Sequence, residues 1–149
     1  TQIDYPVYMQ GQMSKRIILE KFTRHGNAVL LGTASFWEGV DVRGSTLSCV
    51  IIDKLPFAAP DDPLLQAKMQ DCQMQGKDPF AHIQLPQAVI ALKQGVGRLI
   101  RDNKDKGVLV ICDNRLVTRQ YGQVFLKSLP PMRRTRSLED ANTFLKHIN

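Results

Sequence analysis

The sequence predicts an α/β protein with a mainly parallel sheet. Three observations predict this fold class: short apolar runs recur along the chain, helix-length segments separate them, and glycine or proline stands at most boundaries. Strands that alternate with helices form βαβ units, whose strands run parallel. With 149 residues, of which 43% are hydrophobic, the chain suits one packed domain.

The first part of the chain is predicted to form a strand, a helix and a second strand. These elements are an extended run over residues 5–9, a helix between Ser14 and Gly26, and a buried strand over residues 28–31. Ser14 is a suitable N-cap, and Gly26 suits the left-handed position at a helix C-terminus.

The middle of the chain is predicted to contain a buried strand and a polar helix. The run from Leu47 to Ile52 is nearly continuously apolar, as in a parallel strand that is covered on both faces. Asp62 followed by Pro63 predicts a capped helix that ends near Gly76.

Four more elements are predicted in the last part of the chain. They are a helix from Pro86 whose apolar pattern continues to Ile100, a strand over residues 108–112, a helix over residues 117–129, and a last helix capped by Ser137. Residues 130–136 combine proline and arginine, so they predict a linker, and residues 130–149 a C-terminal appendage.

The cysteines indicate neither a disulfide framework nor a zinc site. Cys49, Cys72 and Cys112 lie 23 and 40 residues apart, whereas both kinds of site need closely spaced pairs. The three histidines are equally scattered. We therefore expect no metal site in this chain, and reduced thiols in a cytoplasmic protein.

The N-terminus and the apolar runs carry no targeting signal. No run approaches the roughly 18–20 apolar residues that cross a bilayer, and no basic-then-apolar leader follows Thr1. Neither membrane insertion nor secretion is predicted. Because position 1 is not Met, we expect the chain to be a piece of a longer protein.

The positive charge is concentrated in one tract. The chain has 20 Lys and Arg, 14 Asp and Glu, and a net charge of +6. Between Asn114 and Leu138 there is no acidic residue, and the basic ones are Arg115, Arg119, Lys127, Arg133, Arg134 and Arg136. Such a tract attracts phosphates or acidic partners. A solvated face and an oligomer contact are the alternatives.

Common nucleotide and acyl-transfer motifs are missing from the sequence. Gly95 and Gly97 resemble the start of a dinucleotide fingerprint, but Ile100 stands at the third glycine position and the pair follows a helical pattern. Neither a phosphate loop nor a nucleophile elbow occurs. The chain alone therefore lacks a complete apparatus for nucleotide hydrolysis.

Two segments carry chemistry. Residues 32–44 follow a predicted strand and combine three glycines, two carboxylates, small hydroxyls and Trp37; such a loop can admit a ligand backbone and stack on bases, or Trp37 can instead fill the core. In residues 94–101, Arg98 and Arg101 are three positions apart, so on a helix their side chains would project from the same side. Two guanidinium groups on one side can bind a triphosphate, and Gly97 leaves room for it to approach. Two surface arginines without a ligand are the alternative.

Together these segments resemble the second motor domain of superfamily 2 helicases, in the iron–sulphur branch of DinG- and XPD-like DNA helicases. Residues 35–41, read as Ser-Phe-Trp-Glu-Gly-Val-Asp, are similar to motif V of that branch, and residues 94–101 to motif VI, Gln-x-x-Gly-Arg-x-x-Arg. The resemblance implies a RecA-like three-layer domain over residues 1–149, with helices on both faces of the sheet. A strand and helix upstream of Tyr5 are then expected to be missing.

The resemblance also implies roles for individual residues. Motif VI faces ATP across the cleft between the motor domains, with Arg101 as the arginine finger, Arg98 as a second γ-phosphate contact, and Gln94 and Gly97 beside them. Motif V couples the nucleotide site to DNA, and its matching residues here are Glu38, Gly39 and Asp41. On the same loop, the residues expected to contact single-stranded DNA are Thr33, Ser35 and Trp37.

Further expectations concern parts and partners outside the chain. The phosphate loop, which binds most of the ATP and Mg²⁺, and the four cysteines of the 4Fe–4S cluster belong to the family's first motor domain. The implied partners are that domain, single-stranded DNA and, from one branch of the family, the chi subunit of the polymerase III clamp loader. The residues of this chain expected to contact the chi subunit are Arg133, Arg134, Thr135 and Arg136. A role in DNA repair or replication, in the bacterial cytoplasm at the nucleoid, is implied as well.

Overall fold

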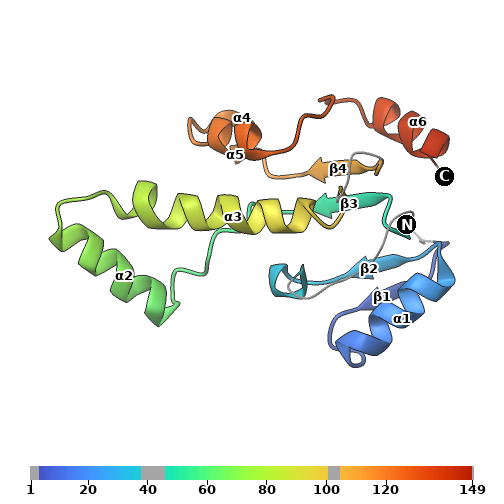
Figure 1. Ribbon diagram of the computed structural model, residues 1–149, viewed down its shortest axis with the longest axis horizontal. Helices are drawn as coiled ribbons and strands as arrows, with labels where there is room; N and C mark the ends of the chain where they lie inside the picture. The colour runs from blue at the N-terminus through green and yellow to red at the C-terminus, as the bar shows by residue number, and fades with distance from the viewer. Residues whose placement is uncertain (1–3, 38–45, 101–104, 149) are drawn as a thin grey trace. The chain divides into compact units, whose positions relative to one another are not determined.

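The structure is a computed structural model that describes residues 4–37, 46–100 and 105–148. The chain divides into two compact units. Unit 1 comprises the described residues within 1–50, 97–109 and 136–149, and unit 2 comprises residues 51–96 and 110–135. Helices and short parallel strands alternate along the chain, as the α/β prediction requires (Figure 1).

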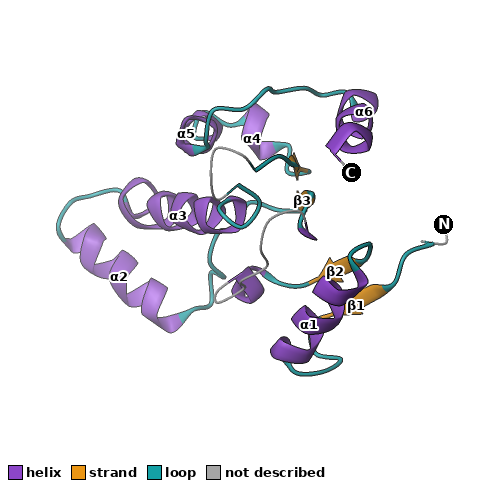
Figure 2. Cartoon of the chain, turned by 45° about the vertical axis from the view of Figure 1, so that its right-hand side comes forward, coloured by secondary structure: helices purple, strands orange, loops and turns teal. Residues whose placement is uncertain are grey.

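Unit 1 begins with a βαβ arrangement. Strands β1 (Val7–Met9) and β2 (Val29–Leu31) pair in parallel, with Val7 opposite Val29. Helix α1 (Lys15–His25) connects them and packs on β1; Figures 1 and 2 both show it lying along this strand pair. All three predicted elements are confirmed, with strands shorter than expected.

The core of unit 1 lies between α1 and the segment that follows β2. Ile18 and Phe22 of α1 meet Phe36, and all three are at most 6% exposed. Phe36 belongs to the short 3₁₀ helix η1 (Ala34–Trp37). Partly buried apolar side chains surround this cluster: Tyr8, Met13, Leu19, Ala28, Leu30 and Leu47. The helix face predicted from Ile18 and Phe22 is therefore the buried one.

Glycine and capping positions confirm the predicted ends of α1 in part. Gly26 has φ of +74°, the conformation that favours glycine, and its N–H donates to the carbonyl of Phe22 at 3.2 Å. Ser14 has the extended backbone of an N-cap, but its side chain makes no capping hydrogen bond.

Strands β3 (Cys49–Ile52) and β4 (Val108–Ile111) form a second pair. The Val108 N–H donates to the Ser48 carbonyl and the Cys112 N–H to the Ile52 carbonyl, both at 2.9 Å. Residue numbers increase in the same direction on both strands, so the two strands are parallel. Ile52 is 3% exposed, whereas Ile51 is 67% exposed. The prediction that this strand is covered on both faces is wrong, because no described residue buries Ile51.

Helices make up most of unit 2. Helix α2 (Pro63–Met74) is followed by a π-helical turn, η3 (Phe80–Gln84), which contacts α2 and continues directly into α3 (Leu85–Val96). Figure 2 shows α2 and α3 joined by this part of the chain. The predicted cap of α2 is confirmed, because Asp62 Oδ1 accepts from the Leu65 N–H at 2.9 Å. The apolar pattern continues across Gly95 and Gly97 to Ile100 and so did not fix the end of helix α3, which ends at Val96: residues 97–99 form a turn.

The single helix predicted over residues 117–129 is wrong. Two helices occupy this region, α4 (Arg115–Thr118) and α5 (Gly122–Ser128), and Arg119 between them is extended. The chain folds back so tightly that a Cβ on Gly122 would lie 2.0 Å from the Leu116 carbonyl oxygen. Glycine at position 122 thus permits the turn that breaks the helix.

The last helix, α6 (Leu138–Ile148), belongs to unit 1 and carries an apolar stripe. Its predicted cap is confirmed, since the Ser137 hydroxyl accepts from the Asp140 N–H at 3.1 Å. No described residue of α6 is fully buried, and Phe144 is 44% exposed.

The core of unit 2 generates a stability prediction. Phe125 is 0% exposed, and its ring lies 5.7 Å from that of Phe57. Phe125→Ala should lower the free energy of unfolding by about 3–5 kcal/mol, because it removes buried apolar surface and leaves a cavity. Val124→Ala, at a 45% exposed neighbour on the same helix, is the control. Urea denaturation followed by circular dichroism measures both, and equal losses would contradict this account.

Candidate functional site

The predicted site residues divide between described and undescribed segments. Arg101, Glu38, Gly39 and Asp41 lie outside the described residues, so their predicted roles stay predictions. Ser35 and Trp37 are placed only as part of the backbone of η1. The side chains that the structure describes are Thr33, Gln94, Arg98 and the C-terminal tract.

The motif V segment begins as a tight turn at the carboxyl end of β2. The Phe36 N–H donates to the Thr33 carbonyl at 2.9 Å, and the Phe36 side chain enters the core. A Cβ on Gly32 would lie 3.0 Å from Phe36 Cβ, which is tighter than most side-chain contacts. Phe36, directly before Trp37, is thus an aromatic residue of this segment that fills the core.

Gln10 holds the same turn from the neighbouring strand. Its Oε1 accepts hydrogen bonds from the Thr33 N–H at 2.8 Å and from Thr33 Oγ1 at 3.1 Å. Gln10 is not among the site residues predicted from the sequence. The available signal was its position at the end of an extended run, directly before Gly11, because groups at the carboxyl ends of parallel strands gather at one edge.

Arg98 follows α3 in a turn rather than on the helix. Leu99 beside it is buried. A Cβ on Gly107 would lie only 2.4 Å from Leu99 Cδ1, so the Leu99 side chain packs directly against this glycine. The prediction that Arg98 projects from a helix shared with Arg101 is therefore wrong for Arg98, because the helix stops at Val96. Gly97 forms the first residue of this turn.

The guanidinium of Arg98 has an unsatisfied donor. Its Nε is buried and has no hydrogen-bond partner among the described residues. A buried donor without a partner costs free energy, so such atoms commonly mark a place where a ligand or another chain supplies the acceptor. Gln94, which is exposed on α3, belongs to unit 2, whereas Arg98 belongs to unit 1.

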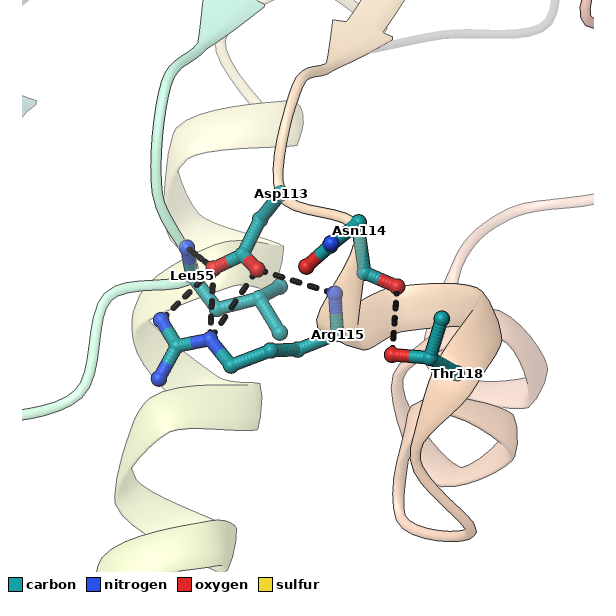
Figure 3. Close-up of polar contacts among 5 residues, drawn as sticks. All are labelled: Leu55, Asp113, Asn114, Arg115 and Thr118. Carbon is teal, nitrogen blue, oxygen red and sulfur yellow. Dashed lines mark hydrogen bonds and ion pairs between the residues drawn. The ribbon is translucent and has the colours of Figure 1, made fainter.

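A charged network holds the loop after β3 to the end of β4 (Figure 3). Asp113 Oδ2 accepts from the Leu55 N–H at 2.9 Å, and Oδ1 accepts from the Arg115 N–H at 3.0 Å. The Arg115 side chain donates from Nε to both carboxylate oxygens at 3.0 Å and from one Nη to Oδ2 at 2.6 Å. The Asp113 side chain is only 6% exposed.

This network changes the acidity of Asp113. The hydrogen bonds from the Arg115 side chain, with those from the Leu55 and Arg115 backbone, hold the pKa of Asp113 well below its usual range. Burial opposes this shift but is the weaker effect. Asp113 is therefore a charged structural anchor, not a general acid or base.

An aromatic cluster extends this network within unit 2. The Arg115 guanidinium lies 5.3 Å from the centre of the Phe57 ring, which stacks on Phe80 at 5.8 Å and meets Tyr121 edge-on at 5.8 Å. The loop after β3 is thus fixed by a hydrogen bond at Leu55 and by ring packing at Phe57.

The basic tract is exposed at residues 133–136. Arg134 donates from one Nη to the Leu126 carbonyl at 2.9 Å, which orients its side chain against the end of α5. Arg133 and Thr135 also make interactions. On α6 the residues that share the apolar stripe are Ala141, Phe144, Leu145 and Ile148.

The cysteines differ in exposure. Cys72 on α2 is buried and Cys112 after β4 is exposed. Cys49 on β3 is half-buried, and this burial raises the pKa of its thiol. Within the described ranges, no three His, Cys, Asp or Glu side chains come together as a metal site would require. Among the described helices, none has the length and apolarity to span a bilayer.

Comparison with known protein families decides the assignment. The helicase C-terminal domain family matches residues 1–132. The chain belongs to this family. The match places both segments singled out from the sequence, residues 32–44 and 94–101, inside a helicase C-terminal domain.

Individual relatives of this helicase C-terminal domain are helicases of bacteria. It is 66% identical over 140 residues to the ATP-dependent DNA helicase YoaA of Escherichia coli and 61% identical over 141 residues to YoaA of Haemophilus influenzae, covering 94% and 95% of the chain. It is 39% identical over 147 residues, 99% of the chain, to the ATP-dependent helicase DinG of Mycobacterium tuberculosis. The aligned region makes up 22% of each of these relatives.

The Asp113 network gives a pH-dependent prediction for this helicase C-terminal domain. Since the folded-state pKa lies below the unfolded value of about 3.9, the stabilisation is complete above about pH 5 and is lost as the pH falls below about 4. Asp113→Asn should therefore lower stability by about 1–3 kcal/mol at pH 7, and this difference should shrink in acid.

Urea denaturation at several pH values measures this difference. Asp71→Asn is the control, because the Asp71 carboxylate is exposed and accepts from the Gln75 side chain of the same helix at 2.9 Å. Its loss should change stability little at any pH. A difference for Asp113→Asn that stays constant down to pH 2 would contradict the assignment.

Proposed function

We propose that the chain is the C-terminal motor half of an ATP-dependent DNA helicase of the DinG and YoaA type. The observation that carries the proposal is the buried Nε of Arg98, which has no hydrogen-bond partner in the part of the chain that the structure describes and lies within the segment similar to motif VI. A guanidinium donor that is already removed from water binds a phosphate oxygen more strongly than a fully solvated one. The family match and the names of the relatives support the same function.

In this proposal, ATP and its Mg²⁺ are held mainly by another motor domain of the complete protein, together with the 4Fe–4S cluster. The present chain supplies positive charge to the transferred phosphoryl group. Arg101 acts as the arginine finger and Arg98 as a second γ-phosphate contact, with Gln94 and Gly97 beside the nucleotide. Because its sequence has no phosphate loop, the isolated chain should not hydrolyse ATP.

The motif V loop then connects the nucleotide site with DNA. Glu38, Gly39 and Asp41 respond to the nucleotide, and Thr33, Ser35 and Trp37 contact single-stranded DNA. The described turn supports this role, since Gln10 and the buried Phe36 fix where the loop leaves β2. DNA repair or replication in the bacterial cytoplasm, at the nucleoid, is the setting that fits these relatives.

Alanine at either arginine tests the nucleotide role. In the complete helicase that carries this chain, Arg98→Ala or Arg101→Ala should lower DNA-stimulated ATP hydrolysis by about 10³-fold or more, because each removes charge from the transition state. Arg119→Ala, at an exposed arginine after α4, is the matched control. Steady-state ATPase assays and thermal melting separate catalysis from folding; normal turnover in both variants would refute the function.

A second role is docking to a replisome component, for which the chi subunit of the clamp loader is the candidate. The observation that favours it is the exposed tract of Arg133, Arg134, Thr135 and Arg136 followed by the amphipathic helix α6. Arg134 is held in place by the Leu126 carbonyl, so one guanidinium is already oriented on the surface. DNA is the competing ligand of the same arginines.

Charge reversal distinguishes these ligands. Arg134→Glu should weaken capture of purified chi subunit by about tenfold and leave ATPase activity unchanged, because like charges then meet at the contact. Arg119→Glu is the control of equal charge change. If capture persists and only the salt-dependent affinity for single-stranded DNA falls, the tract binds DNA instead.

A further inference from the structure

We propose that Gln10 is a positioning residue for DNA coupling: its side-chain oxygen fixes the start of the motif V loop at Thr33. This inference rests on the proposed function and adds a residue that motif V itself does not contain. Gln10 and Thr33 are 23 residues apart in sequence and meet at the carboxyl ends of two paired strands.

The strand register brings Gln10 to the loop. Met9 is opposite Leu31 in the parallel pair, and the Gln10 N–H donates to the Leu31 carbonyl at 2.9 Å. This bond continues the β1–β2 pairing one residue past the end of β1. The Gln10 side chain can therefore reach residues that come directly after β2, and Thr33 is one of them.

The contact depends on an acceptor atom. The Thr33 N–H can only donate, so the atom that faces it at 2.8 Å must be the amide oxygen and not the amide nitrogen. The same oxygen accepts from Thr33 Oγ1 at 3.1 Å. Glutamate at position 10 would keep an oxygen for both bonds, whereas leucine would keep the approximate size and lose both.

The loop is fixed from two directions within its first turn. On the inner side, Phe36 is 6% exposed and packs with Ile18 and Phe22. On the outer side, Gln10 binds the backbone of Thr33. Without the outer contact, the start of the loop would lose one of its attachments, and the DNA-contacting residues that follow would be less well oriented before DNA binds.

The contact is poorly placed to serve stability. Gln10 and Thr33 are both exposed, and exposed hydrogen bonds compete with water. Gln12 provides a comparison within the same turn: its Oε1 accepts from the Met9 N–H at 3.0 Å, a local contact that does not reach the motif V loop. A role in general folding would make the two glutamines equivalent, whereas a positioning role makes only Gln10 important.

The test uses the complete helicase with three variants: Gln10→Leu, Gln10→Glu and Gln12→Leu. ATPase activity is measured against the concentration of an oligo(dT) single strand. Gln10→Leu should raise the DNA concentration for half-maximal stimulation about fivefold, because both exposed hydrogen bonds to Thr33 are lost and each contributes little by itself. Gln10→Glu should restore the value to within about twofold, and Gln12→Leu should leave it unchanged.

Three results would overturn the inference. They are an unchanged half-maximal concentration for Gln10→Leu, the same defect in Gln10→Glu, and an equal defect in Gln12→Leu. Thermal melting of all variants shows whether folding is affected, and a lower melting temperature confined to Gln10→Leu would count against a positioning role. If the unmodified helicase shows no stimulation by DNA, the proposed function itself fails, which is a different outcome from a stimulated enzyme that is indifferent to Gln10.

Discussion

The structure depends on how backbone N–H groups are satisfied where the chain leaves a parallel strand. At that point the ladder ends, and the N–H needs another acceptor. The protein uses the same solution twice, with a side chain that follows one strand of a pair. Gln10 after β1 accepts from Thr33 after β2, and Asp113 after β4 accepts from Leu55 after β3. Each contact fixes a loop at the carboxyl edge of a strand pair, which is the edge where α/β proteins bind ligands.

The two anchors differ in chemistry, and the difference fits their surroundings. Asp113 is nearly buried, so its charge is compensated by a bidentate arginine that also packs on Phe57. Gln10 is exposed and neutral, so its bond to Thr33 can be broken by water at little cost. The first anchor therefore belongs to the framework, while the second holds a segment that must still respond to a ligand.

Much of the fold was predictable because it depends on local chemistry. The cap at Asp62, the left-handed Gly26 and the alternation of strands with helices all follow from neighbouring residues. The errors arose where contacts between distant residues decide the structure. Apolar periodicity alone continues α3 through Arg98 and joins α4 to α5, but Leu99 packs beside Gly107, and Gly122 lies against the Leu116 carbonyl. Arg98 was found from its motif, whereas the burial of its Nε without a described partner and the reach of Gln10 require coordinates.

The graded exposure of the cysteines has a practical consequence for following motions of this protein. Cys112 lies open to reagents, Cys49 is half-covered, and Cys72 is enclosed within unit 2. An alkylating probe therefore reads three levels of accessibility in one chain without any engineered label. Reaction of Cys49 before Cys72 would indicate local opening at strand β3, whereas reaction of Cys72 would indicate opening of the helical core of unit 2.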